Sequence, residues 1–386
     1  MNELVLIAVG GNALLRPGEV GSIEQESANA ELTAERIADV IERGYRVILT
    51  HGNGPQIGSQ LLRSESASAT VYPLPLDMCV SMTQGEIGLL LQRSLQSALR
   101  RRGLQPLAVT LVTQVRVDAN SPAFQHPTKP IGPLLTEEEA RRKQAQHGWS
   151  IIRETGRGYR RAVPSPSPTE IVEIEAIRRC LNEKVVVIAA GGGGVPVIRT
   201  NGGMKGIEAV IDKDRTSALL ASELGVGRYI MLTDVECVYA DFGKPSQRPL
   251  NCLTVEEALH YLAGDHFGEG SMKPKIESAI DFLTKGGTEA IITDAGRLLE
   301  ALEGPQGTHI IMGTPMGEQK WGTAMFEIEL TDQERDLLTQ AIEVYLSDLR
   351  MEIGNTDSSD YREKLKTRKN TLSKILQTLR ETKESA

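Results

Sequence analysis

The sequence predicts an α/β fold in which helices cover both faces of a mainly parallel β-sheet. The first observation is the helical periodicity of three segments, 30–43, 86–102 and 214–224. The second is a set of short segments that are apolar on both faces and alternate with these helices. That alternation is typical of right-handed βαβ units. The short apolar segments that indicate such strands are 4–9, 47–50, 107–111, 185–190, 229–233 and 290–293.

Length and composition exclude several classes of protein. A chain of 386 residues is long enough for two or three structural units, or for one large α/β unit with an appendage. Its 40% hydrophobic and 24% charged residues argue against a disordered, collagen-like or disulfide-scaffold protein. The formal net charge of −8 provides no overall positive field for nucleic acid or anionic lipid. An anionic substrate must therefore be held by local cations.

The cysteines and the absence of long apolar segments indicate a cytoplasmic protein. No stretch reaches the ~18 apolar residues that a membrane-spanning helix needs, and no signal-peptide pattern opens the chain. We therefore expect no membrane association and a reducing compartment. The cysteines are far apart and contain no CxxC pair: Cys79, Cys180, Cys237 and Cys252.

The segment 118–168 interrupts the alternation of strands and helices. It is rich in proline, glycine and charge, and about fifty residues is unusually long for a structureless loop. We interpret it as a protruding, lid-like lobe with a functional role. The alternative is a solvated loop.

Beyond Gly313 the sequence changes to long helical patterns. Thr331 and Glu334 form a capping-box pattern at the start of the first. We predict a helical hairpin at 314–386, appended to a body at 1–313, that packs against the body or a partner subunit; a regulatory role is the alternative. A turn at 354–360 separates its two apolar stripes, Leu338, Ile342, Tyr345 and Leu349, then Leu365, Leu372, Ile375, Leu376 and Leu379.

Three glycine-rich turns follow predicted strands, at 10–12, 51–55 and 191–194. Glycine permits positive φ angles and close approach of the backbone, and consecutive amides at a helix N-terminus form an anion site. Together the turns indicate phosphate binding, although each could also be a tight βα turn. Neither GxxxxGK[ST] nor GxGxxG occurs, so the sequence supports neither a P-loop enzyme nor a dinucleotide-binding dehydrogenase.

Three lysines stand beside proline, glycine or aspartate: Lys129, Lys213 and Lys275. Catalysis of phosphoryl transfer consists mostly of positioning and cation placement, so these lysines are candidates for that chemistry. Asp212 is the candidate that orients them. For Asp214 we favour a structural role as the cap of helix 215–224.

The histidines provide no metal-binding pair. None of the six has the spacing of one, and His51, beside the second glycine turn, is interpreted as a turn residue and not as a general base.

These motifs, in this order, resemble those of the carbamate kinases of the amino-acid kinase superfamily. The resemblance implies a three-layer αβα sandwich, the amino-acid kinase fold, over 1–313. It also implies a homodimer that transfers phosphoryl between ATP and carbamate with Mg²⁺, giving carbamoyl phosphate and ADP, as in ATP generation during arginine or related nitrogen catabolism. The matching segments are 10–13, 51–58, 82–85, 127–133, 156–158, 163–166, 191–196, 205–214 and 274–277.

The resemblance implies three sets of site residues and assigns no metal ligand from the protein. The catalytic set is Lys129, Asp212, Lys213 and Lys275. The set that binds carbamate or carbamoyl phosphate is Gly10, Gly11, Asn12, Gly52, Asn53 and Gly54. The nucleotide set is Thr233, Asp234, Val235, Tyr239, Lys244 and Lys275.

Three features depart from the family pattern. Lys273 adds a cation near Lys275, which we interpret as a solvated side chain, and Asp234 replaces a glycine. The segment after Gly313 lies beyond the family's ordinary end, and its partner is left open. Two alternative functions are a related kinase acting on another carboxylate or phosphate, and a nucleotide-sensing binding module that uses the helical tail.

Overall fold

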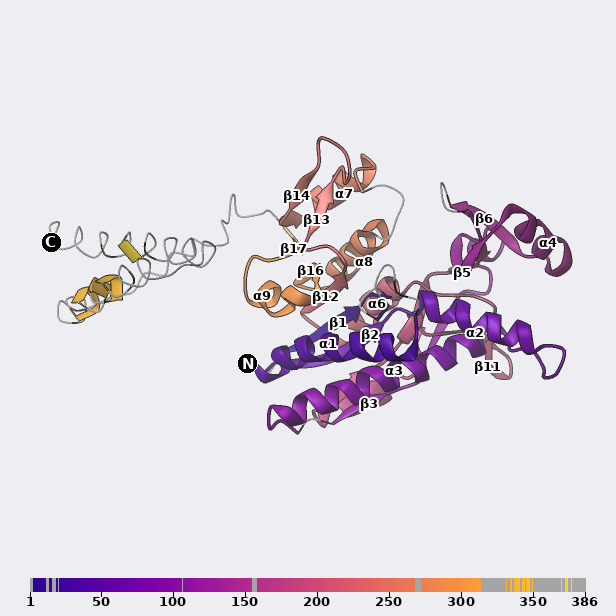
Figure 1. Cartoon of the computed structure of the whole chain (residues 1–386), viewed down its shortest axis with the longest axis horizontal. Helices are drawn as coiled ribbons and strands as arrows, with labels where there is room; N and C mark the ends of the chain where they lie inside the picture. Colours follow the sequence, from indigo (N-terminus) through magenta and orange to yellow (C-terminus); the bar gives the residue numbers. More distant parts are fainter. Residues whose placement is uncertain are drawn as a thin grey trace. The chain divides into compact units, whose positions relative to one another are not determined.

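The computed structural model describes most of the first 313 residues and scattered helical positions beyond them. The chain divides into two compact units, 1–322 and 323–386 (Figure 1). The described residues are 3–313, except 12–13, 16–18, 20, 106, 155–157 and 268–271, together with 331, 334, 337–340, 342–343, 345–347, 349, 369, 372–373 and 376.

The first unit is built on an eight-stranded sheet in the order β15-β17-β16-β12-β1-β2-β9-β3. The six strands predicted from the sequence are its parallel part, and β17 and β15 extend it at one edge, with β17 antiparallel to β16. The predicted strands are β1 (Leu4–Val9), β2 (Arg46–His51), β3 (Ala108–Thr110), β9 (Val186–Ile188), β12 (Arg228–Thr233) and β16 (Glu289–Asp294). The added strands are β15 (Cys252–Thr254) and β17 (Thr308–Ile311).

Helices cover both faces of the sheet, which confirms the three-layer αβα sandwich. Alternate residues of β1 point to opposite faces: Leu6 packs in one buried apolar cluster, and Val5 and Ile7 pack in the other. One face carries α1 (Ile23–Glu42), α3 (Leu76–Arg101) and α9 (Leu298–Glu303). The other carries α5 (Ile174–Asn182), α6 (Lys213–Leu224), α7 (Val255–Ala263) and α8 (Met272–Thr284).

Two smaller sheets and a hairpin surround this core. One sheet has the strand order β11-β10-β4-β8, and β13 pairs with β14 in the hairpin. Their bounds are β4 (Gln114–Val117), β8 (Pro168–Ile171), β10 (Val195–Thr200), β11 (Gly203–Gly206), β13 (Val238–Ala240) and β14 (Arg248–Leu250).

The lobe, residues 118–168, contains the other small sheet, which is antiparallel and has the order β5-β7-β6. A helix, α4, lies between β5 and β6 in the chain, and Figure 1 shows these elements grouped away from the central sheet. The helix α2 (Gly54–Ala67) contacts β5 and so joins the lobe to the body. The lobe elements are β5 (Lys129–Leu135), α4 (Glu137–His147), β6 (Ser150–Glu154) and β7 (Gly158–Val163).

The second unit begins its first helix as the sequence predicts. The Thr331 backbone amide donates to the Glu334 carboxylate at 2.9 Å, and the Glu334 amide donates to Oγ1 of Thr331 at 3.3 Å, which confirms the capping box. Among the described positions, Ile342 and Leu349 of the first apolar stripe are buried, whereas Leu338 and Tyr345 are exposed. The predicted turn at 354–360 lies outside the described residues, as do Leu365, Ile375 and Leu379 of the second stripe.

None of the described helices is long and apolar enough to span a membrane.

Gly88 of α3 lies so close to β3 that we expect an alanine there to destabilise the protein. A Cβ on Gly88 would lie 2.2 Å from Cγ2 of Thr110, and overpacking of this kind costs about 1–3 kcal/mol. Gly88→Ala should lower the free energy of unfolding, measured by chemical denaturation, by that amount. Gly202→Ala is the control, because a Cβ there meets nothing within 4 Å. Equal stability of the two variants would contradict the close packing of α3 on β3.

Candidate active site

Two glycine turns meet where β1 and β2 end. The strands are parallel, with Val9 beside His51, so both turns leave the same edge of the sheet. A Cβ on Gly52 would lie 3.2 Å from the backbone nitrogen of Gly11, and one on Gly10 would lie 2.7 Å from the carbonyl oxygen of Leu232. A side chain at Gly52 would press on the first turn, and one at Gly10 would clash with β12, so glycine permits both close contacts.

The second turn leads directly into α2. Asn53 precedes this helix, but its side chain makes no capping hydrogen bond and instead donates to Oγ1 of Thr83 at 2.9 Å. The amides of the first helical turn therefore have no capping side chain from Asn53, and Gly54 is exposed there. An uncapped helix N-terminus beside a glycine turn is suited to hold an anion. Asn12 lies outside the described residues.

Three lysines from three separate elements meet at two neighbouring aspartates. Lys129 begins β5, Lys213 begins α6, and Lys275 lies in α8. Lys129 Nζ lies 2.8 Å from Asp212 Oδ2. Lys213 Nζ lies 2.9 Å from Asp214 Oδ1, and Lys275 Nζ lies 3.0 Å from Asp214 Oδ2. We call these five residues the lysine–aspartate cluster. Its three cations and two anions leave an excess of one positive charge.

The cluster lies beside the glycine turns. A Cβ on Gly52 would lie 3.4 Å from Cδ of Lys213, so the lysine stem runs along the bare backbone of the turn. Of the three lysine side chains, Lys275 is 7% exposed, Lys213 is 13% exposed and Lys129 is 27% exposed. The lobe therefore supplies the most accessible cation, and the body supplies the two buried ones.

The structure gives the helix-cap role that was expected of Asp214 to Asp212. Asp212 caps α6: its Oδ1 accepts from the amide of Asp214 at 2.9 Å and from that of Arg215 at 3.4 Å. The prediction that Asp214 caps this helix is therefore wrong, because Asp214 already belongs to the first turn and both of its oxygens contact lysines. Asp212 contacts only Lys129 among the three lysines, and Asp214 holds the other two.

The charges of the cluster depend on one another. Burial favours the neutral form of Asp214, but Lys213 and Lys275 outweigh burial and hold the pKa of its carboxyl below the ordinary value. Burial also opposes ionisation of Asp212, and Lys129 keeps the pKa of that carboxyl lowered. Burial lowers the pKa of the Lys213 ammonium, and the contact with Asp214 counteracts this effect. Each charge of the cluster is thus in contact with an opposite one, and Asp214 is shared by two lysines.

The third glycine turn packs beneath the second. It forms the 3₁₀ turn Gly191–Gly193 and leads into the strand β10, so it is not a βα turn. A Cβ on Gly191 would lie 2.2 Å from Nε2 of His51, and one on Gly192 would lie 2.2 Å from Nδ2 of Asn53. Its glycines make room for the second turn.

His51 is a structural residue of that turn, as the sequence indicated. It is 1% exposed, and its Nδ1 donates to the carbonyl oxygen of Gly52 at 3.0 Å. Burial, with Lys213 nearby, lowers its pKa to about 4, so the imidazole is neutral at neutral pH.

The predicted nucleotide residues follow β12 at the same edge of the sheet. Oγ1 of Thr233 lies 3.1 Å from a carboxylate oxygen of Asp234, and the Tyr239 hydroxyl donates to Glu236 at 3.0 Å. Val235, which follows Asp234 in the chain, is half-buried. Lys244 pairs with Asp241 at 3.0 Å within the β13–β14 hairpin, so it is not a member of the lysine–aspartate cluster. The additional lysine of α8, Lys273, is exposed as expected.

Hydroxyl contacts that the sequence did not reveal hold the start of α6. Oγ1 of Thr50 lies 2.7 Å from Oγ of Ser217, which also donates to the carbonyl oxygen of Lys213 at 2.7 Å. Tyr229 donates to the carbonyl oxygen of Asp214 at 3.1 Å. Thr50 lies in β2 and Tyr229 in β12, and the order of the strands in the sheet brings both to α6, so no local pattern could have associated them with the site.

The fold and the cluster define a phosphoryl-transfer protein, and the chain belongs to the amino acid kinase family, whose sequence profile matches residues 3–294. It is 46% identical to a carbamate kinase of Pyrococcus furiosus over 313 residues, which are 81% of this chain and all of that protein. It is 44% identical to the carbamate kinase-like protein YahI of Escherichia coli over 315 residues, 81% of this chain and 99% of that one. The solved structure of Giardia lamblia carbamate kinase bound to AMP-PNP matches with a TM-score of 0.76 at 38% identity, over 81% of this chain and 99% of that one.

We expect His51 to make the protein less stable in mild acid. Its pKa of about 4 in the folded protein is below the ordinary 6.5, so between these pH values the unfolded chain binds a proton that the folded one does not. As the pH drops from 6.5 to 4, protonation of the His51 imidazole in the unfolded chain should lower the free energy of unfolding by up to about 3 kcal/mol. Denaturation at a series of pH values should show a smaller fall in His51→Gln, whereas the exposed control His126→Gln should match the wild type. A His51 imidazole titrating near pH 6.5 by NMR would contradict this prediction.

Proposed function

We propose that the chain catalyses reversible phosphoryl transfer between ATP and carbamate, giving carbamoyl phosphate and ADP. The observation that carries the proposal is the lysine–aspartate cluster, in which three ammonium groups gather beside the glycine turns in a chain of net charge −8. The names of the relatives, which match this chain over 80% of its length, support carbamate as the substrate.

In this proposal Lys129, Lys213 and Lys275 stabilise the charge on the moving phosphoryl group. The transfer is in line, with no covalent enzyme intermediate, because carbamate is already a nucleophilic anion and requires no general base. The neutral, buried His51 agrees with a mechanism of this kind. Asp212 and Asp214 orient the lysines and keep their charges paired until the substrates bind.

The two substrates take opposite sides of the cluster. Carbamate or the carbamoyl group lies at the glycine turns, against the backbone of Gly10, Gly11, Asn12, Gly52, Asn53 and Gly54. The nucleotide lies over the C-terminal strands, near Thr233, Asp234, Val235, Tyr239 and Lys244, with Lys275 between its phosphates and the body.

Mg²⁺ would enter with the nucleotide. In sites of this kind it takes most of its ligands from phosphates and water, with one or two carboxylates. Asp212, whose side chain is 21% exposed, is the carboxylate of the cluster that could contact it. The ion would supply positive charge that neutralises part of the negative charge of the nucleotide phosphates.

Removing a body lysine should abolish most of the activity. We expect the full chain to form ATP from MgADP and carbamoyl phosphate, with the activity lost on adding EDTA and restored by Mg²⁺. Lys213→Ala should lower kcat by about 10²- to 10³-fold, the loss expected for a well-placed donor. Lys273→Ala is the control, because this lysine of α8 is exposed and should leave the rate near that of the wild type.

Two results would contradict the proposal. Full activity of Lys213→Ala would show that Lys213 takes no part in phosphoryl transfer. A wild-type chain that binds MgADP but forms no ATP would point to another acid substrate, to be identified with a panel of carboxylates and phosphates.

The proposal includes a cytoplasmic homodimer. The free cysteines among the described residues agree with a reducing compartment. The outer face of α3 provides a surface for a second copy, because Met78, Met82 and Leu89 are 47%, 42% and 54% exposed along one helical stripe. A symmetric contact would place this stripe against itself. Residues 314–386 lie beyond the matched family profile, and we propose that they are an addition to a complete kinase body.

A charge on the α3 stripe should separate the dimer. Leu89→Asp should give a monomer by light scattering at concentrations where the wild type is a dimer, because a carboxylate is costly to bury. Leu259→Asp is the control, since Leu259 of α7 is 51% exposed on a different helix. A chain shortened to 1–322 should remain a dimer with unchanged turnover per subunit. A dimeric Leu89→Asp variant would place the interface elsewhere.

A further inference from the structure

The helix α2 connects the glycine turn to the lobe. Its first residue, Gly54, belongs to the turn, and Glu65 lies in its last turn. The lobe strand β5, which α2 contacts, begins at Lys129. The position of this lysine over Asp212 therefore depends on how the lobe sits on α2.

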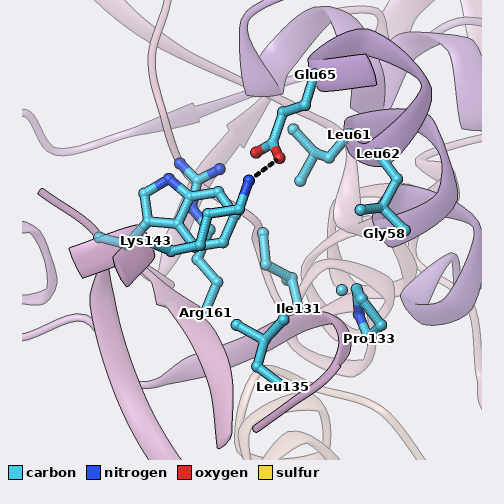
Figure 2. Close-up of a pocket in the computed structure, with 11 residues that line it drawn as sticks. Gly58, Leu61, Leu62, Glu65, Ile131, Pro133, Leu135, Lys143 and Arg161 are labelled. Carbon is cyan, nitrogen blue, oxygen red and sulfur yellow. Dashed lines mark hydrogen bonds and ion pairs between the residues drawn. The ribbon is translucent and has the colours of Figure 1, made fainter. Parts of the chain in front are cut away.

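The lobe touches α2 at two points. A Cβ on Gly58 would lie 2.6 Å from Cα of Gly132, so the helix and β5 are in backbone contact there. Lys143 Nζ of α4 lies 2.7 Å from Glu65 Oε2, as Figure 2 shows. Gly58 and Glu65 are seven residues apart, which is about 10 Å along a helix. Two contacts at that separation fix the direction of β5 as well as its distance from α2.

Trp149 connects this ion pair to the strands of the lobe. Lys143 Nζ lies 4.9 Å from the centre of the Trp149 ring, and the Arg161 guanidinium lies 4.7 Å from it. Arg161 is in β7, directly opposite Ile131 of β5. A change at Glu65 can thus reach β5 through Lys143, Trp149 and Arg161.

The space enclosed by these residues is too small for a ligand. It has a volume of about 40 Å³, which is room for a few water molecules. Most of its walls are apolar, and Figure 2 shows Leu61, Ile131 and Leu135 turned toward it. The junction is therefore a packed contact between lobe and helix.

We propose that Glu65, Lys143 and Trp149 form a latch that fixes the lobe on α2 and thereby positions Lys129 for phosphoryl transfer. These are positioning residues, because their effect on the reaction passes through Lys129. The inference rests on the proposed function, since it assigns the latch a role in that reaction. Only the lobe lysine depends on it, because Lys213 and Lys275 belong to the body.

The kinetic test breaks the latch and then rebuilds it with reversed charges. Glu65→Gln, Lys143→Met and Trp149→Ala should each lower kcat for ATP formation about tenfold, because a small displacement of a catalytic group is costly. KM for MgADP should not change, since the nucleotide residues lie on the body. The double variant Glu65→Lys with Lys143→Glu should recover most of the loss, as expected for a direct pair.

The matched control is Arg141→Met. Arg141 lies on α4 as Lys143 does, but it pairs with Glu137 of its own helix and is 77% exposed. It should keep the wild-type kcat. The latch is refuted if the three single variants keep full kcat, or if Arg141→Met loses as much as they do.

Hydrogen exchange of the full chain tests the latch without using activity. The amides of 129–135 should exchange faster in Glu65→Gln and Lys143→Met than in the wild type, and at the wild-type rate in Arg141→Met. Unchanged exchange in the latch variants would overturn the proposal. A wild-type chain that forms no ATP would reject the proposed function alone, and the exchange rates would then decide whether the latch exists.

Discussion

The proposed active site depends on keeping three like charges close together, although they repel one another. Two carboxylates accomplish this: Asp214, 5% exposed, bridges two buried lysines, and Asp212 holds the third, which comes from the lobe. A buried ionic cluster is weak evidence for stability, since apolar residues of similar volume often serve as well or better. Its value here is electrostatic, because the cluster presents a net positive charge in a low-dielectric site where anionic groups must approach each other.

The surrounding fold is arranged around this requirement. Glycines let the backbone of the turns lie against Lys213 and against each other, and hydroxyl groups from β2 and β12 hold the first turn of α6. Asp212 has two tasks: one oxygen caps α6 and the other contacts Lys129. The helix α6 carries Lys213 and Asp214 in its first turn, and a third member of the cluster, Asp212, caps the start of that helix.

The sequence was sufficient to predict the layers and the parts of the site that local pattern determines. Apolar segments identified the six parallel strands, and the glycine turns and three lysines were found because their neighbours are unusual. The cap of α6 was predicted at Asp214 and lies at Asp212, because a two-residue difference in where a helix begins is invisible to periodicity. The packing of His51 and Asn53 against the Gly191 turn was not predicted, since nothing local in the sequence shows it. Thr50 and Tyr229 were missed because the order of the strands in the sheet, and not a local pattern, brings them to α6.

The position of β1 in the central sheet has a consequence for synthesis of the chain. β1 pairs with β2 on one side, but its other partner, β12, begins only at residue 228. At about 5–20 residues per second, the ribosome needs roughly ten to forty seconds to make the intervening chain. During that time the most central strand of the future core has an open apolar edge, the kind of surface that pairs with other chains. The order of strands thus leaves one edge of β1 unpaired in the nascent chain until β12 has been synthesised.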